Sequence, residues 1–281
     1  MKPYNYNKIL NYIFVSLDWI FKMFIVLLFL FPFYWMIITS LKTNSEAILV
    51  PPTLWPRHFT LEGYIILIQK IKLFTYVKNS VFVTFGCIIL ELVIMVPAAY
   101  AFAKFDFIGK KLFFAMILVA FMIPTQLTFI TVYLMMAKHK LLNTLLPQIL
   151  PFGANAFGIF LLRQTFMQIP DEIIESARLD NAKEAKIMFK LMLPMCQSTV
   201  VTIALFSFVG HWNSYFWPLV MTDKEIVRPL TIALEKLKDV EYGINWNLIM
   251  AGNVLLVFPI LIIFVFASRK IIQAFAYKGV K

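Results

Sequence analysis

The chain has 281 residues, of which 61% are hydrophobic and only 15% are charged, and its formal net charge is +11. Soluble domains are ~45–50% apolar and ~25% charged, so this composition excludes an ordinary soluble protein. Three long segments carry no Asp, Glu, Lys or Arg at all, namely residues 112–137, 191–222 and 242–268. Because a helix crosses a bilayer with roughly 20 predominantly apolar residues, we expect a multi-pass membrane protein.

Six membrane-spanning helices are predicted, in an all-α polytopic fold that forms one transmembrane domain over residues 1–281. The spans are expected at about 19–40, 79–103, 112–136, 142–163, 196–219 and 246–268. An even number of spans places both termini on one side of the membrane. Lys and Arg are slightly more numerous on that side, which favours cytoplasmic termini. The basic excess is explained by loops that face lipid headgroups, so no nucleic-acid partner is expected.

Every predicted span has a proline within it or at its edge. The prolines are Pro32, Pro97, Pro124, Pro147, Pro151, Pro218 and Pro259. Such prolines are tolerated where neighbouring helices satisfy the freed carbonyls, which indicates a packed bundle. Two cysteines, Cys87 and Cys196, fit no metal-ligand spacing and are expected in the core, and no metal site is predicted.

One acidic residue, Glu91, lies deep in the second predicted span. A charged side chain at the centre of a membrane helix costs roughly 2.5–3.5 kcal/mol on insertion scales. We therefore expect Glu91 to face the interior of the bundle. Three roles stay open at this point: packing between helices, lining a transport path, or proton coupling.

The connection between the fourth and fifth spans, residues 164–195, has the pattern of two short amphipathic helices with a turn between them. Asp171 and Glu172 follow Pro170, in the first turn where acidic groups suit the helix dipole. Asp180 and Asn181 form a turn pair, since Asn tolerates left-handed geometry better than most residues. A connection this long in a compact protein is usually functional, and its pattern is that of a docking helix.

This connection resembles the "EAA" loop of ABC-importer permeases. That pattern reads Glu-Ala-Ala, three residues, Gly, nine residues, and Ile-x-Leu-Pro. Here Glu175-Ser176-Ala177, then Asn181, then Leu191-Met192-Leu193-Pro194 keep every spacing. The departures are Ser for Ala, Asn for Gly and Leu for Ile, and none of them forbids the docking geometry.

The resemblance implies a cytoplasmic coupling helix that docks in a groove of a separate ATPase. The residues carried over as ATPase-coupling residues are Glu175, Ser176, Ala177, Arg178, Asp180, Asn181, Leu193 and Pro194. Leu193 and Pro194 would link movement of the loop to the fifth span. The implied assembly lies in the bacterial plasma membrane and contains a second permease, which makes a heterodimer, two ATP-binding subunits and an extracellular solute-binding protein.

Four other segments resemble the permeases of carbohydrate importers, specifically the second permease of a maltose-type importer. They are Phe31 to Lys42, Ala98 to Phe105, Met122 to Gln126, and Trp212 to Leu219. A sugar or oligosaccharide is the implied substrate. Sugar sites combine aromatic faces with a few amide or hydroxyl partners. On this ground the candidate residues of the substrate path are Glu91, Gln126, Asn155, His211, Trp212, Asn213 and Tyr215.

Polar residues within spans also hold helices together, and Trp and Tyr also form interfacial belts, so a packing role stays open for each candidate. The chain has no GxxxxGK[ST] phosphate loop. We therefore expect a non-catalytic permease, with ATP and Mg²⁺ bound only by the partner ATPases and no cofactor on this chain. The alternatives are a related importer of a polyamine or a phosphate ester, or an ion-coupled carrier that uses Glu91.

Overall fold

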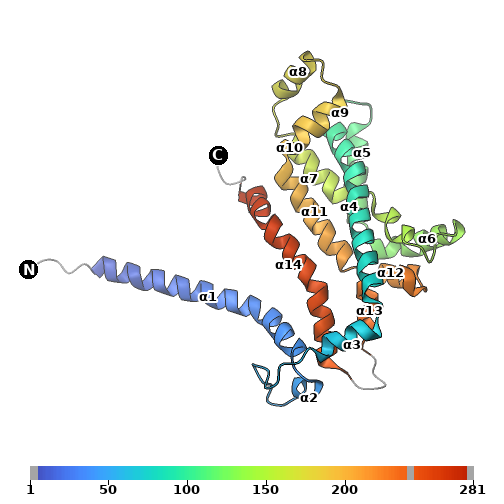
Figure 1. Ribbon diagram of the computed structural model, residues 1–281. Helices are drawn as coiled ribbons and strands as arrows, with labels where there is room; N and C mark the ends of the chain where they lie inside the picture. The colour runs from blue at the N-terminus through green and yellow to red at the C-terminus, as the bar shows by residue number, and fades with distance from the viewer. Residues whose placement is uncertain (1–5, 239–243, 277–281) are drawn as a thin grey trace, which may run out of the picture. The chain divides into compact units, whose positions relative to one another are not determined.

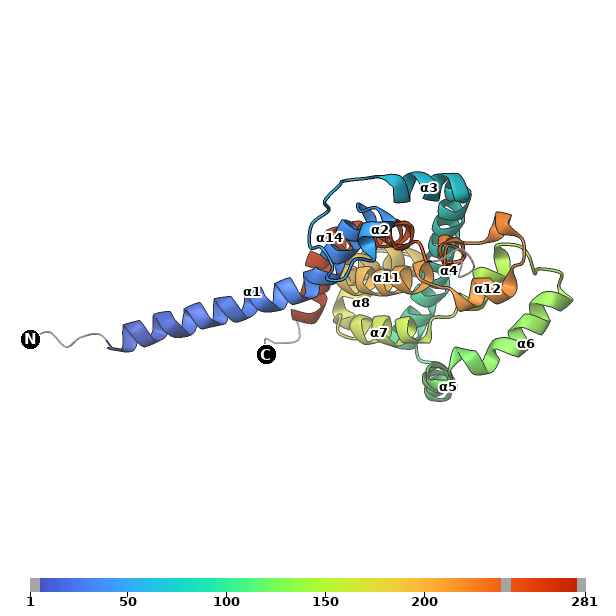
Figure 2. The same cartoon turned by 90° about the horizontal axis from the view of Figure 1, so that it is seen from below.

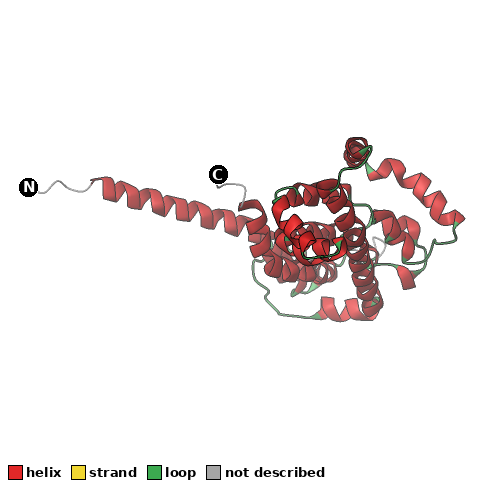
Figure 3. Ribbon diagram, turned by 90° about the horizontal axis from the view of Figure 1, so that it is seen from above, coloured by secondary structure: helices red, strands yellow, loops and turns green. Residues whose placement is uncertain are grey.

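The computed structural model describes residues 6–238 and 244–276, and within them the chain is built from helices, turns and loops (Figures 1 and 3). It divides into two compact units. The first contains residues 1–71 and 237–255, and the second contains residues 72–236 and 256–281.

The first unit contains α1 (Tyr6–Ser40), α2 (Asn44–Ala47), α3 (Glu62–Lys70) and the start of α14 (Trp246–Ala276). The loop that follows α1 is held by a buried cation. Lys42 lies over the ring of Trp35, 4.7 Å from Nζ to the ring centroid, and it donates to the carbonyl of Thr53. Asn247 Nδ2 donates to the Lys42 carbonyl at 3.1 Å. These contacts order the polar exit from the first apolar helix.

The second unit is arranged around three helices, α4 (Leu73–Lys104), α7 (Ala156–Phe166) and α11 (Gln197–Trp212), which lie side by side (Figure 1). Their shared core includes Met95, Leu162 and Phe166, all fully buried. Gly158 allows the close approach of α7 to α4, since a Cβ there would lie 2.3 Å from Met95 Sδ. The remaining elements of this unit are α5 (Lys110–Met122), α6 (Thr125–Lys138), η1 (Leu146–Gln148), η2 (Leu150–Phe152), α8 (Asp171–Leu179), α9 (Glu184–Lys186), η3 (Ile187–Met192), α10 (Leu193–Met195), α12 (Phe216–Met221), η4 (Glu225–Val227), α13 (Leu230–Glu235) and the rest of α14.

Within residues 6–238 and 244–276, three helices are long and apolar enough to cross a membrane: Phe14–Ser40, Leu73–Lys104 and Trp246–Lys270. Two bent helix pairs raise the number to as many as five. The all-α membrane class is confirmed, and the predicted spans 19–40, 79–103 and 246–268 each lie in one long helix. The number six stays a prediction.

The other three predicted spans are interrupted, and in two of them proline lies at the break. The segment expected at 196–219 consists of α11 and α12, which are separated at residues 213–215. The segment expected at 112–136 consists of α5 and α6, which meet at 98° where Pro124 precedes α6 (Figure 2). The segment expected at 142–163 begins with two 3₁₀ turns that contain Pro147 and Pro151 before α7 starts. Proline has no N–H for the helical ladder. In contrast, α1, α4 and α14 continue through Pro32, Pro97 and Pro259.

Candidate functional site

The predicted coupling segment, residues 164–195, forms two short helical stretches. The first is α8, which begins after Pro170 with two acidic residues in its first turn and buries Ile174. The second runs through α9, the π-helix η3 and α10, and buries Ile187 and Met192. Both apolar faces pack on the core shared by α4, α7 and α11. The expectation of two amphipathic helices is confirmed.

The turn between the two stretches is a Schellman motif made with Asn instead of Gly. Asn181 has φ 58°, in the left-handed region. Its N–H donates to the Arg178 carbonyl at 2.9 Å, and the N–H of Ala182 donates to the Ala177 carbonyl at 3.0 Å. These bonds satisfy carbonyls that the end of α8 leaves free. Asn181 therefore fills the position where the resemblance expects Gly.

Both parts of the coupling segment are tied to the C-terminal end of α4 by a set of polar contacts. We call Tyr100, Lys104, Asp171, Arg178 and Glu184 the clamp network. Lys104 Nζ donates to Asp171 Oδ1 at 2.7 Å and to the Ile169 carbonyl at 2.6 Å. The Tyr100 hydroxyl donates to Glu184 Oε2 at 2.6 Å, and Arg178 Nε donates to Glu184 Oε1 at 2.8 Å.

Charge pairing in the clamp network is reflected in two pKa values. The hydrogen bond and the positive charge of Lys104 hold the pKa of Asp171 below its ordinary value of 3.8. The hydrogen bond to Glu184 raises the pKa of Arg178. Both groups therefore stay charged at neutral pH.

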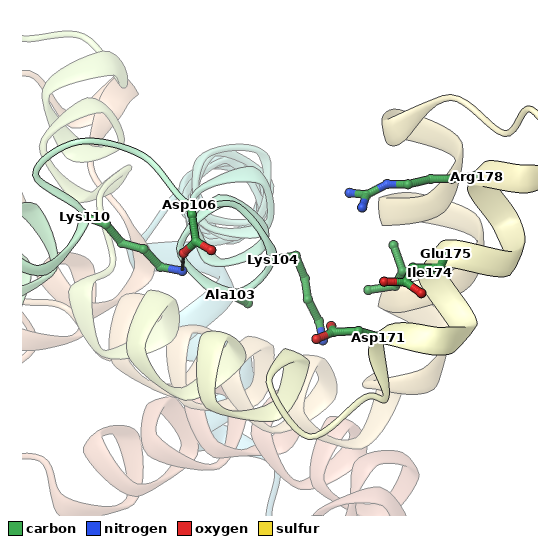
Figure 4. Close-up of a pocket in the computed structure, with 8 residues that line it drawn as sticks. All are labelled: Ala103, Lys104, Asp106, Lys110, Asp171, Ile174, Glu175 and Arg178. Atoms are coloured by element: carbon green, nitrogen blue, oxygen red, sulfur yellow. Dashed lines mark hydrogen bonds and ion pairs between the residues drawn. The ribbon is translucent and has the colours of Figure 1, made fainter.

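A pocket of about 240 Å³ lies between α8 and the end of α4 (Figure 4). Its lining is strongly polar and carries both signs of charge. The lining residues are Ala103, Lys104, Asp106, Lys110, Asp171, Ile174, Glu175 and Arg178. Lys104 reaches Asp171 across the pocket, while Lys110 pairs with Asp106 at 3.1 Å from Nζ to Oδ1. Glu175, the first residue of the predicted motif, faces this space with no ion pair among the described residues.

The predicted ATPase-coupling residues lie mostly on the outer surface of the segment. Glu175, Ser176, Arg178, Asp180 and Asn181 are exposed, and Ala177 is half-buried. Beside them, Leu179 is 83% exposed, so this surface includes one large apolar side chain. A polar helix with one projecting apolar side chain is suited to a groove in a partner.

Leu193 and Pro194 lie where the segment joins the fifth predicted span. They form α10, and the stretch Glu184–Met195 meets α11 at 83°. The coupling segment therefore joins the fifth predicted span through a sharp bend, and the transmission of movement by Leu193 and Pro194 stays a prediction.

A second polar site lies inside the bundle, where Glu91 is the acceptor at its centre. We call Glu91, Asn155, Ser207 and His211 the buried polar network. His211 Nε2 lies 2.9 Å from Glu91 Oε1. Asn155 Nδ2 donates to Glu91 Oε2 at 3.3 Å, and the Ser207 hydroxyl also donates to Oε2. Glu91 is only 5% exposed, so the expectation that it faces the bundle interior is confirmed.

Asn155 has a second function in this network, because it caps α7. Its Oδ1 accepts from the Gly158 N–H at 2.8 Å while its Nδ2 bonds Glu91. The network thus joins the middle of α4, the start of α7 and the second half of α11. Buried polar groups that are fully hydrogen-bonded hold helices in one arrangement.

The other candidates for a substrate path lie elsewhere. Trp212 is buried, donates from Nε1 to the Leu256 carbonyl at 2.8 Å and stacks on Phe208, so it has a packing role. Asn213 is exposed and donates to the Val209 carbonyl at 2.9 Å. Gln126 and Tyr215 are exposed, on α6 and at the start of α12 respectively. Only Glu91, Asn155 and His211 of the seven candidates meet in one cluster.

Sequence reasoning did not single out Ser207, Tyr100, Lys104, Asp171 or Glu184 as site residues. Tyr100 and Lys104 lie within the segment Ala98 to Phe105, whose resemblance to carbohydrate permeases was the available signal. Among the described residues no three His, Cys, Asp or Glu side chains are grouped as a metal ion would require.

Comparison with known proteins finds relatives that match most of the chain. Residues 94–276 match the family described as "Binding-protein-dependent transport system inner membrane component". The arabinooligosaccharides transport system permease protein AraQ of Halalkalibacterium halodurans is 31% identical over 261 residues, which cover 92% of this chain and 93% of that protein. The diacetylchitobiose uptake system permease protein DasC of Streptomyces coelicolor is 30% identical over 253 residues, with 89% and 91% covered.

A solved structure supports the fold independently. The bacterial ABC transporter involved in the import of the acidic polysaccharide alginate has a chain that superposes with a TM-score of 0.82 at 23% identity, covering 96% of this chain and 99% of that one. The helices long enough to span a membrane agree with the family match. This chain therefore belongs to the family of binding-protein-dependent transport system inner membrane components.

Proposed function

We propose that the chain is one permease subunit of an ATP-driven, binding-protein-dependent importer of a sugar or an oligosaccharide. The observation that carries the proposal is the coupling segment, in which Asn181 is left-handed and Glu175 and Leu179 are exposed on helices whose apolar faces pack in the core. The substrate class rests on the carbohydrates named for AraQ and DasC.

In this proposal the chain itself catalyses nothing, and a separate pair of ATPase subunits binds ATP and Mg²⁺. When ATP binding draws the two ATPase subunits together, α8 moves with the ATPase groove in which it is docked. That movement switches a cavity formed with a second permease between inward-facing and outward-facing states. An extracellular solute-binding protein delivers the substrate to the outward-facing state, and the termini and the coupling segment face the cytoplasm.

Sugar contacts are assigned in this proposal to exposed polar and aromatic residues of the spans. Gln126, Asn213 and Tyr215 are accessible to a ligand, whereas Glu91, Asn155 and His211 already bond one another. We therefore assign the buried polar network to holding the helices and the exposed group to the substrate path. Trp212 is assigned to packing.

The test is reconstitution of the four-subunit importer in proteoliposomes with its solute-binding protein. ATP hydrolysis and uptake are measured across a panel of oligosaccharides, one phosphate ester and one polyamine. We expect loaded binding protein to stimulate ATP hydrolysis with oligosaccharides alone. Stimulation by the phosphate ester or the polyamine would replace the sugar assignment.

A deletion of Glu175–Asn181 tests the coupling assignment in the same system. The deletion removes most of α8 and its turn, so we expect the ATPase subunits to leave the complex during purification. Retention of the ATPases would contradict the docking role. Uptake that stops with an uncoupler while ATP is held constant would show an ion-coupled carrier instead.

A further inference from the structure

Helix α4 carries both polar networks of the second unit. Glu91 lies near its middle, and Tyr100 and Lys104 lie in its last two turns. At 1.5 Å per residue, Tyr100 is about 13.5 Å further along the helix axis than Glu91. One helix therefore reaches from the buried polar network to the coupling segment.

The contacts at the end of α4 reach both helical stretches of the coupling segment. Lys104 bonds Asp171 and the Ile169 carbonyl, which are the entry to α8. Tyr100 bonds Glu184, the first residue of α9, and Glu184 in turn holds Arg178 in the last turn of α8. Neither end of α8 can therefore move without changing a hydrogen bond or ion pair that connects it to α4.

The two α4 side chains are buried while their partners are accessible. The side chain of Lys104 is 6% exposed, but that of Asp171 is 76% exposed. Tyr100 is 4% exposed, whereas the side chain of Glu184 is 43% exposed. The bonds thus connect two side chains of α4 that are packed in the core to two carboxylates of the coupling segment that a docked partner can reach.

The chain path from α8 to α11 is interrupted, whereas α4 is one continuous helix. The stretch that follows α8 contains the π-helix Ile187–Met192, and it joins α11 at a bend of 83°. The helical hydrogen-bond ladder changes at π-helical turns and at sharp bends. The bonds to α4 are therefore a separate connection from the coupling segment to the core, in addition to the chain path.

We propose that Tyr100 and Lys104 are positioning residues that transmit movement of the coupling segment to α4, and through α4 to the helices joined by the buried polar network. The proposal rests on the proposed function, because it takes the segment to be the ATPase dock. It adds a second route, through side chains of the second span, to the expected route through Leu193 and Pro194. Packed helices with two discrete arrangements carry coupling of this kind.

The test uses the assembled importer in proteoliposomes and the variants Tyr100→Phe and Lys104→Met. Tyr100→Phe removes one hydroxyl and keeps the ring that packs on Phe105 and Phe166. The matched control is Tyr76→Phe, in the first turn of the same helix, whose buried side chain makes no hydrogen bond among the described residues. The measurement is substrate taken up per ATP hydrolysed, together with subunit content and Tm.

We expect both variants to assemble with the Tm of the control and to lose uptake per ATP by about fivefold to tenfold, within the usual range of coupling between sites. Lys104→Arg, which keeps the charge, should restore most of the loss. Uptake per ATP equal to that of Tyr76→Phe would overturn the proposal. So would a loss of Tm large enough to remove the complex, because that outcome shows a structural role.

A double-mutant cycle with Glu184→Gln identifies the bond responsible. If Tyr100 acts through Glu184, the double variant should lose no more uptake per ATP than the worse single variant. Additive losses would show that Tyr100 acts elsewhere. Failure of the proposed function would give a different result, because the unmodified complex would then bind no ATPase or show no ATP-driven uptake.

Discussion

The two polar networks on α4 differ in their surroundings more than in their chemistry. In the buried polar network the carboxylate of Glu91 is 5% exposed and accepts three side-chain bonds from α7 and α11. In the clamp network the carboxylate of Asp171 forms an ion pair with Lys104 and is largely open to water. Losing a partner inside the bundle leaves an unpaired buried charge, whereas water replaces a lost partner at the surface.

This difference agrees with separate roles for the two networks: the buried polar network holds the helices together, and the clamp network transmits movement of the coupling segment. A network that is costly to break suits a fixed joint between helices. A network whose contacts are individually weak suits a surface that exchanges partners when another subunit docks. Four changes are given in order of decreasing expected effect. The first and the last test the two networks themselves, and the other two test the helix packing and the turn beside them.

Glu91→Ala should have the largest effect on stability. The variant leaves Asn155, Ser207 and His211 without their common acceptor, and each buried donor left unsatisfied in this way costs about 1–3 kcal/mol. Thermal unfolding of the purified complex measures the change. The control is Glu62→Ala, at the exposed start of α3. Equal Tm values for the two variants would show that the buried polar network does not hold the helices.

Gly158→Ala should have the second-largest effect on stability, and its cause is packing and not charge. The added Cβ would lie 2.3 Å from Met95 Sδ, so either the buried Met95 side chain or α7 would have to shift. Overpacking of this kind costs about 1–3 kcal/mol. Gly210→Ala is a matched control, because nothing lies within 4 Å of a Cβ at that helical position. A Tm loss at Gly210 as large as that at Gly158 would contradict the packing explanation.

Asn181→Ala should have a smaller and local effect. A residue with a Cβ and no local hydrogen bond pays about 1–2 kcal/mol in the left-handed region that Asn181 occupies. Asn181→Gly should be neutral or slightly stabilising. Hydrogen exchange of the coupling segment in the intact complex measures both. If Ala and Gly gave the same exchange rates, the Schellman turn would not depend on this residue.

The pH dependence of the Lys104–Asp171 pair should be the smallest effect. Because the pKa of Asp171 is lowered, the pair contributes fully above the ordinary value of 3.8 and is lost as pH falls through the lower folded value. Near neutral pH no change is expected. A nuclear magnetic resonance titration of the Asp171 carboxyl measures the midpoint, which should rise in Lys104→Met. An unchanged midpoint would show that Lys104 does not lower this pKa.

The sequence was sufficient for features that depend on local spacing. Apolar segments predicted the membrane class because bilayer thickness sets helix length. The turn at Asn181 and the two amphipathic helices around it were predicted because their pattern repeats every three or four residues. Proline positions marked the interruptions at Pro124, Pro147 and Pro151, although the spans were expected to continue through them.

Contacts between residues far apart in the sequence could not be predicted from local patterns. The Tyr100–Glu184 bond joins residues separated by 84 positions, and the Glu91–His211 pair joins residues separated by 120. Neither pair follows from helical periodicity, which says which face is apolar but not which helix will cover it. Glu91 could be predicted to need partners, because an isolated buried charge is costly, but its partners could not be named.

By itself, then, the sequence determined that this protein spans the membrane and that residues 164–195 form two amphipathic helical stretches, since composition and short-range spacing carry that information. Only the tertiary structure decided that α4 links the segment to a buried polar network. The physical reason is that helix packing brings together side chains from three helices, and their hydrogen bonds form only once the apolar faces between them are buried.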